Sequence, residues 1–122
     1  MTERNLDNLL DNISTAILLL DHNVVIRFAN LSAEALFEHS RNQLVGHPLN
    51  EFLISQCIEL SKFKHALIHN ENFAESEIQL VFNDGRHCLA SLVASVYEEE
   101  NGPLLALEIT PIEQQKKINE EN

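Results

Sequence analysis

The sequence predicts an α+β domain with a five-stranded antiparallel sheet in which the helices are inserted after the second strand. Three observations favour this class: two apolar runs joined by a polar turn near the N-terminus, a central block with helical spacing, and a C-terminal part in which apolar residues alternate. The length of 122 residues and the hydrophobic content of 44% fit one compact domain with its own core.

The first two strands are predicted as a hairpin. Its apolar runs are Ile17–Leu20 and Val24–Phe28, and Asp21-His22-Asn23 between them are residues that tolerate a tight turn. Runs this continuous indicate strands that are covered on both faces. Asn30 then ends the second strand with a side chain that can bond nearby backbone, and a helical pattern follows at once.

Three separate helical segments are predicted between the hairpin and residue 70. A short helix is expected over Leu31–His39, and it is broken before Gly46, which can take a positive φ, and Pro48. A short helical piece follows at Asn50–Ile54. The longest helix is expected over residues 55–70, with a buried face that is made of Leu53, Cys57, Leu60, Phe63 and Leu67.

The last three strands are predicted from a change of period. From Glu75 to Phe82 apolar residues alternate with polar ones, and Asn83-Asp84-Gly85-Arg86 forms a strong hairpin turn. His87–Tyr97 is the return strand. Leu104–Ile109 is the fifth strand, and Pro111 is expected to end it.

Both ends of the chain are expected to lie outside this core, which gives a division into 1–13, 14–112 and 113–122. Residues 1–13 form an amphipathic helix whose narrow apolar stripe either packs on the sheet of its own chain or joins two subunits. Residues 113–122 are charged and polar, so they form the start of a linker helix or a frayed tail. The stripe, and thus the expected dimer interface, consists of Leu6, Leu9, Leu10 and Ile13.

The charge and the cysteine pattern exclude several classes of function. With 19 acidic and 8 basic residues the net charge is −11, which repels nucleic acid and anionic membranes. No run approaches the roughly 20 apolar residues of a membrane span, so we expect a cytoplasmic chain. Cys57 and Cys88 are far apart and form no metal or redox motif, so both are expected to be buried as small hydrophobes.

Three motifs in this order resemble a PAS domain: L-D-x-x-x-x-I-x-x-A-N at Leu20–Asn30, L-V-G-x-P-L at Leu44–Leu49 and E-I-T at Glu108–Thr110. Within them Asp21, Asn30 and Gly46 match structural positions of the family. Many PAS domains close with Asp-x-Thr, so Glu108 is a departure that gives the acidic side chain a longer arm.

The hairpin ILLLDHNVVIRFAN, together with both ends of the chain, is also similar to the N-terminal sensory domain of the nitrogen-regulation sensor histidine kinases, the NtrB class. The resemblance implies a cytoplasmic, dimeric kinase and phosphatase as the parent protein. It further implies two partners, a response regulator and a protein that signals nitrogen status.

Catalytic chemistry is not expected in this chain. The sequence contains no phosphate-binding glycine loop, no G-x-S-x-G and no histidine in a phosphoacceptor setting. His65 and His69 are the best candidate ligands for a metal or haem, but at about 100° per residue they face away from the apolar stripe of their helix. We therefore expect solvated histidines and no metal. Cys57 does not match the cysteine motif of flavin-binding PAS domains.

A core filled by side chains, without a cofactor, is the resulting expectation. The function predicted first is a cofactor-free, dimerising signal-relay domain, and the alternative is a sensor that binds a small molecule between the sheet and the long helix. The signal is expected to leave through Glu108 and Thr110, which are predicted to anchor the exit through hydrogen bonds to neighbouring groups; the alternative is that both are merely outward-facing strand residues. The predicted core consists of Leu18, Leu20, Ile26, Phe37, Leu53, Leu60, Phe63, Leu67, Phe82, Leu92 and Leu107.

Overall fold

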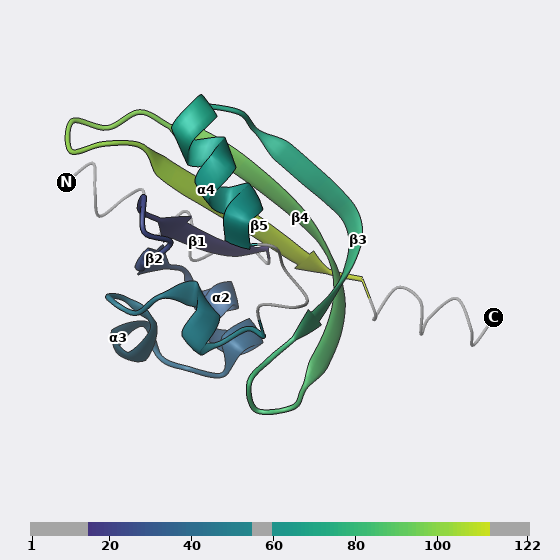
Figure 1. Ribbon diagram of the computed structural model, residues 1–122. Helices are drawn as coiled ribbons and strands as arrows, with labels where there is room; N and C mark the ends of the chain where they lie inside the picture. The colour runs from purple at the N-terminus through teal and green to yellow at the C-terminus, as the bar shows by residue number, and fades with distance from the viewer. Residues whose placement is uncertain (1–14, 55–59, 113–122) are drawn as a thin grey trace.

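The computed structural model describes residues 15–54 and 60–112, which form a sheet with helices on one face (Figure 1). Within these residues there are five strands and four helical segments, and the helical segments all lie between the second and third strands, as the sequence predicts. Their bounds are β1 (Ala16–Leu20), β2 (Ile26–Ala29), α2 (Leu31–Phe37), α3 (Arg41–Leu44), the 3₁₀ helix η1 (Leu49–Glu51), α4 (Leu60–His69), β3 (Phe73–Val81), β4 (His87–Tyr97) and β5 (Leu104–Pro111).

The sheet has the strand order β2-β1-β5-β4-β3, and every neighbouring pair is antiparallel. β5, the last strand in the chain, therefore lies at the centre. It pairs with β4 along its whole length and with β1 over Leu105–Ile109, so that Leu107 lies opposite Leu18 of β1 on one side and Ala94 of β4 on the other. A central strand is held by two ladders of hydrogen bonds, so its position is tied to that of the entire sheet.

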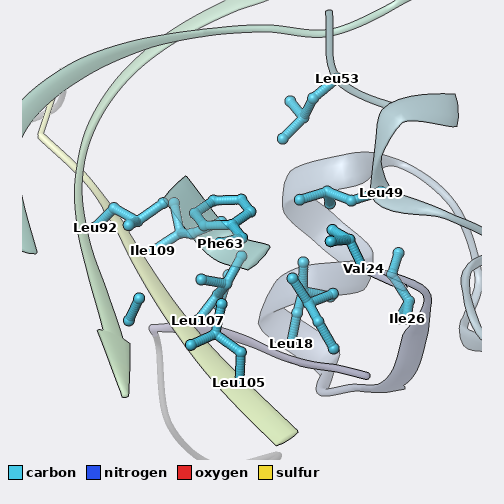
Figure 2. Packing of buried hydrophobic residues seen from close by; sticks show 14 of the residues in the cluster. Leu18, Val24, Ile26, Leu49, Leu53, Phe63, Leu92, Leu105, Leu107 and Ile109 are labelled. Carbon is cyan, nitrogen blue, oxygen red and sulfur yellow. The ribbon is translucent and has the colours of Figure 1, made fainter. Parts of the chain in front are cut away.

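One face of the sheet packs against the helices and forms the core. Alternate residues of the central strands are fully buried there, and Figure 2 shows Phe63 of α4 projecting toward Leu92, Leu107 and Ile109. Of the predicted core residues, Leu60 is only half-buried against the core. The others are all buried: Leu18, Leu20, Ile26, Phe37, Leu53, Phe63, Leu67, Phe82, Leu92 and Leu107.

Two of the helical segments after β2, α2 and η1, are shorter than predicted. α2 ends at Phe37 because Glu38 adopts a left-handed conformation (φ 57°) and donates its N–H to the carbonyl of Glu34. α3 was not predicted; the Gln43 side chain, which accepts from the N–H of Ser40 (3.0 Å), marks its start. The expected helix at Asn50–Ile54 is a single 3₁₀ turn, η1, because the N–H of Ile54 instead bonds to Val81 of the sheet (2.8 Å).

The second strand also begins later than predicted. The turn after β1 extends through Val24, which has a left-handed φ of 61°, so β2 starts at Ile26 rather than at Val24. Positive φ is unfavourable for a β-branched residue. The turn is held in this form by Asp21, whose backbone carbonyl accepts from Val24 N (2.8 Å).

Some predicted features lie outside the described residues. These are the N-terminal helix with Leu6, Leu9, Leu10 and Ile13, the linker segment 113–122, and Cys57. They stay predictions. No helix in residues 15–54 and 60–112 is long and apolar enough to cross a membrane.

Candidate signal exit and motif residues

The exit of the chain from the sheet is the first candidate site. β5 keeps Leu105, Leu107 and Ile109 on the core face, so Glu108 and Thr110 lie on the opposite face, where both are exposed. The strand continues past the expected stop, because Pro111 still pairs with Ala90 of β4 and the N–H of Ile112 donates to the carbonyl of Leu89 (2.9 Å). The chain is therefore fixed to β4 up to Ile112.

Glu108 and Thr110 point in the same direction along β5. Glu108 lies opposite Ile17 of β1 and Val93 of β4, and Thr110 lies opposite Ser91. Neither side chain bonds to another residue in the part of the chain that the structure describes. This placement fits the alternative of outward-facing strand residues better than the alternative of hydrogen-bonded anchors. That these two residues carry a signal stays a prediction.

Asn30 joins three elements from a fully buried position. Its Oδ1 accepts from the backbone N–H of Ile17 in β1 (2.9 Å) and from that of Ala33 in α2 (2.9 Å), while its Nδ2 donates to the carbonyl of Thr15 (3.0 Å). It is thus the N-cap of α2 as well as a side-chain link across the hairpin. Asparagine suits this position because it both accepts and donates without charge.

Asp21 holds the turn between β1 and β2. Its Oδ1 accepts from the N–H of Asn23 (2.9 Å) and of Val25 (3.1 Å), and its Oδ2 accepts from Arg27 Nε (2.8 Å). Burial by itself would raise the pKa of Asp21, but the hydrogen bonds from Val25, Asn23 and Arg27 outweigh it, so the pKa lies below its ordinary value. The ion pair with Arg27 was not predicted from the sequence.

Gly46 lets the helical segment cover the edge of β2. Gly46 has a φ of 90°, and its N–H donates to the carbonyl of Ile26 (2.7 Å). The N–H of Ile26 donates in turn to the carbonyl of His47 (2.9 Å). Val25 and Pro48 form a β-bridge next to these bonds. The positive φ that the sequence predicts at this glycine is what allows the chain to run back along β2.

The histidines of α4 are exposed, as their spacing predicts. The rings of His65 and His69 lie 4.2 Å apart between centroids, and His65 Nε2 is 3.2 Å from a carboxylate oxygen of Glu71. Within residues 15–54 and 60–112, no three histidine, cysteine, aspartate or glutamate side chains gather to hold a metal ion. Cys88 was expected to be buried, but it is half-buried, with its Sγ 3.7 Å from the carbonyl oxygen of Leu89.

An open groove of about 520 Å³ lies between α4 and the start of β3. Ala66 of α4 and Phe73 and Ala74 of β3 contribute apolar surface to its lining. The rim carries charges of both signs, including the ion pair between Lys62 and Glu75. The groove has room for a small molecule, but it is open to solvent and lies beside the core rather than inside it.

Comparison with known proteins agrees with these motifs. The family model described as PAS fold matches residues 4–108. The sensory histidine kinase/phosphatase NtrB of Escherichia coli O157:H7 is 28% identical over 120 residues, which are 98% of this chain and 33% of that protein. NtrB of Klebsiella oxytoca is 31% identical over 113 residues, 93% of this chain and 31% of that protein. The chain therefore spans about a third of the length of these curated relatives.

Solved structures show the same fold. The PAS domain of nitrogen regulation protein NR(II) from Vibrio parahaemolyticus superposes with a TM-score of 0.72 at 25% identity, covering 88% of this chain and 97% of that one. A PAS domain from a two-component sensor histidine kinase gives a TM-score of 0.74 at 15% identity, covering 90% and 96% of the two chains. With the sheet order, the buried Asn30 and the match over residues 4–108, the chain belongs to the PAS family and is related to the PAS domains of NtrB sensor kinases.

Proposed function

We propose that this chain is the regulatory, signal-relay domain of a two-component nitrogen-regulation sensor histidine kinase and phosphatase. It forms a homodimer and works without a cofactor. In the parent protein, which we place in the cytoplasm, it would control activity toward a response regulator in answer to a nitrogen-status signalling protein. The support is the relation to proteins named sensory histidine kinase/phosphatase NtrB and to the PAS domain of NR(II). Catalysis would belong to other parts of the parent protein.

The observation that carries this proposal is the central position of β5. The strand is held between β1 and β4, and it leads without a break to Ile112 and the segment that follows. A change in the packing of the sheet therefore reorients the start of the following segment. An edge strand would not couple the chain end to the whole sheet in this way.

A cofactor-free core is supported by its packing. The space between the helices and the sheet is occupied by large side chains such as Phe37, Phe63 and Phe82, each no more than 2% exposed. Phe37 meets Phe82 edge to face at 5.3 Å between ring centroids. A haem or flavin in this space would have to displace them.

The relay is tested by Thr110→Val in the full-length parent protein. The substitution keeps the shape of an exposed strand residue and removes its hydroxyl, so we expect the ratio of kinase to phosphatase activity to change by about threefold or more, or about 0.7 kcal/mol. The melting temperature of the isolated 122-residue chain should stay nearly the same. Ser95→Ala is the matched control, since it removes a hydroxyl from β4, opposite Ala106 and away from the exit.

An unchanged activity ratio in Thr110→Val would show that this residue carries no signal. A change of equal size in Ser95→Ala would mean that hydroxyl loss anywhere on this face has the same effect. Either result would count against an exit role for Thr110.

The alternative function, a sensor that binds a small molecule, is favoured by the groove between α4 and β3. Native mass spectrometry of the protein purified from its host, together with an absorption spectrum, separates the two proposals. The relay proposal expects the mass of the polypeptide alone and no colour. A bound small molecule that is lost in Ala74→Trp, which places a large side chain in the groove from an exposed position, would support the sensor instead.

A further inference from the structure

We propose that Arg86 is a positioning residue that couples the helical layer to the exit of the chain. It fastens the end of α2 to the turn between β3 and β4, and the bond that holds Ile112 lies three residues further along β4. The inference rests on the proposed function in one respect, namely that a signal leaves through β5. The coupling itself is a physical property that can be measured in this chain alone.

The guanidinium of Arg86 caps the C-terminal end of α2. Nη1 donates to the carbonyl of Leu36 (3.1 Å) and Nη2 to that of Phe37 (3.2 Å). The last carbonyls of a helix have no partner within the helix and carry partial negative charge, so a forked cation is well suited to bind two of them. The carboxylate of Glu38, the residue after α2, lies 3.5 Å from Nη1 and adds to this attraction.

The side chain of Arg86 is itself held in place from two sides. Its Nε donates to Asp84 Oδ2 (2.9 Å), and its guanidinium carbon lies 4.3 Å from the centroid of the Phe82 ring. Phe82 in turn packs edge to face on Phe37, whose carbonyl Arg86 binds. The arginine is therefore fixed before it reaches α2, which reduces the entropy lost in forming the two bonds.

The two halves of the turn are attached to different helical segments. On the β3 side, the N–H of Asn83 donates to the carbonyl of Phe52, just after η1 (2.9 Å). On the β4 side, the attachment of the turn to α2 is through Arg86. Strand β4 begins at the next residue, His87, and the carbonyl of Leu89 accepts the bond from Ile112 (2.9 Å).

A displacement of α2 therefore reaches the exit by a short route. It moves Arg86, then the first residues of β4, and then the bond between Leu89 and Ile112. When Arg86 releases α2, Asn83 still holds the β3 side and β4 stays paired with β3, but the start of β4 loses its own attachment to α2. The end of β5 is then less protected, while the centre of the sheet is not affected.

Hydrogen exchange of backbone amides, followed by NMR on the 122-residue chain, tests this coupling. Arg86→Gln removes the charge and the guanidinium group that binds the two carbonyls. We therefore expect hydrogen exchange at the amide of Ile112 to accelerate by about tenfold or more relative to the amide of Leu107 in the centre of β5. Arg86→Lys keeps the charge but cannot bind two carbonyls in a fork, so its effect should be smaller. Should Arg86→Gln fail to fold, Arg86→Lys gives the same comparison.

Arg41→Gln is the matched control. Arg41 is also an arginine of the helical layer, with Nε 3.5 Å from Glu34 and its guanidinium 5.7 Å from the ring of Phe28. Because these two contacts are to α2 and β2 rather than to β4, the exchange rate of Ile112 relative to Leu107 should stay within about twofold of the wild-type value.

Equal acceleration of Ile112 and Leu107 in Arg86→Gln would overturn the proposal, since Arg86 would then contribute only to global stability. Unchanged exchange at Ile112 would overturn it as well. Kinase and phosphatase activities of the full-length Arg86→Gln variant test the proposed function separately. If Arg86→Gln accelerates exchange at Ile112 but not at Leu107 and leaves the ratio of kinase to phosphatase activity unchanged, the coupling is confirmed and the relay is contradicted.

Discussion

Asp21 and Asn30 are the two polar side chains buried within the described residues, at 8% and 0% exposure. Every buried side-chain nitrogen and oxygen in this part of the chain has a hydrogen-bond partner. Buried polar groups of this kind stabilise only when all their bonds are made, because an unpaired one costs about 1–3 kcal/mol. The bonds of these two residues therefore fix the geometry of the first hairpin and of the start of α2.

Asp21 predicts a pH dependence of stability. Because the pKa of Asp21 is lowered by folding, its contribution is complete above the ordinary carboxyl pKa of about 4 and is lost as the pH falls through the lowered value. Asp21→Asn keeps an acceptor but has no charge, so we expect it to be less stable than wild type by about 1 kcal/mol at pH 7. The difference should shrink toward zero near pH 2.

Urea unfolding of both proteins at the two pH values measures this difference. Glu77→Gln, which neutralises an exposed carboxylate on β3, is the control and should change stability little at either pH. If the gap between wild type and Asp21→Asn is as wide at pH 2 as at pH 7, the charge of Asp21 is not what stabilises the turn.

Strand β5 is the element on which the proposed function depends. Its residues alternate between the core and an exposed face, and its end remains bonded to β4 up to Ile112.

The helix predicted over residues 1–13 is the other element that matters for signalling, because it would link the sheet of one subunit to a second copy. A helix this short is not stable alone, so its apolar stripe requires a partner.

Replacing Leu6 and Leu9 by aspartate tests that partner. We expect the wild-type chain to sediment as a dimer at tens of micromolar, roughly the range a regulatory contact needs, and the double variant as a monomer. Asn5→Asp/Asn8→Asp adds the same two charges at polar positions of the predicted helix and should remain dimeric. A monomeric wild type, or a dimer that survives both aspartates in the stripe, would contradict a dimer interface at these residues.

The helical layer and the sheet share one hydrophobic core. α4 supplies Phe63, Ala66 and Leu67, the sheet supplies its central apolar residues, and the ring of Phe63 also stacks on Phe73 at 5.7 Å between centroids. A protein with an interior packed in this way loses stability when a single large side chain is removed, because neighbouring residues fill the resulting cavity only in part. Layer packing of this kind is how movement in the helices would reach the sheet.

Phe63→Ala should therefore lower the free energy of unfolding by about 3–5 kcal/mol, measured by urea denaturation. Ile68→Ala, on the same helix, is the control: Ile68 is 76% exposed, so its loss should change stability by about 0.5 kcal/mol or less. A cost below about 1 kcal/mol for Phe63→Ala would mean that the space between α4 and the sheet is loosely filled. That outcome would favour the alternative of a ligand-binding sensor.

The sequence by itself determined the number of strands, the place of the helices after the second strand and most of the buried face of each element. These follow from periodicity, which is a local property: every second residue of a strand and every third or fourth residue of a helix must be apolar. The positive φ of Gly46 and the cap at Asn30 were also predictable, because their residue types favour those roles.

Only the tertiary structure decided the sheet order, the left-handed Val24 and the bonds of Arg86. The sequence marks Asn83 to Arg86 as a turn, but Arg86 binds Leu36, 50 residues earlier, and no local pattern encodes that distance. The central place of β5 likewise depends on pairing with β1 and β4 at the same time. Such features arise from contacts between segments far apart in the chain, which is why periodicity and turn chemistry do not reveal them.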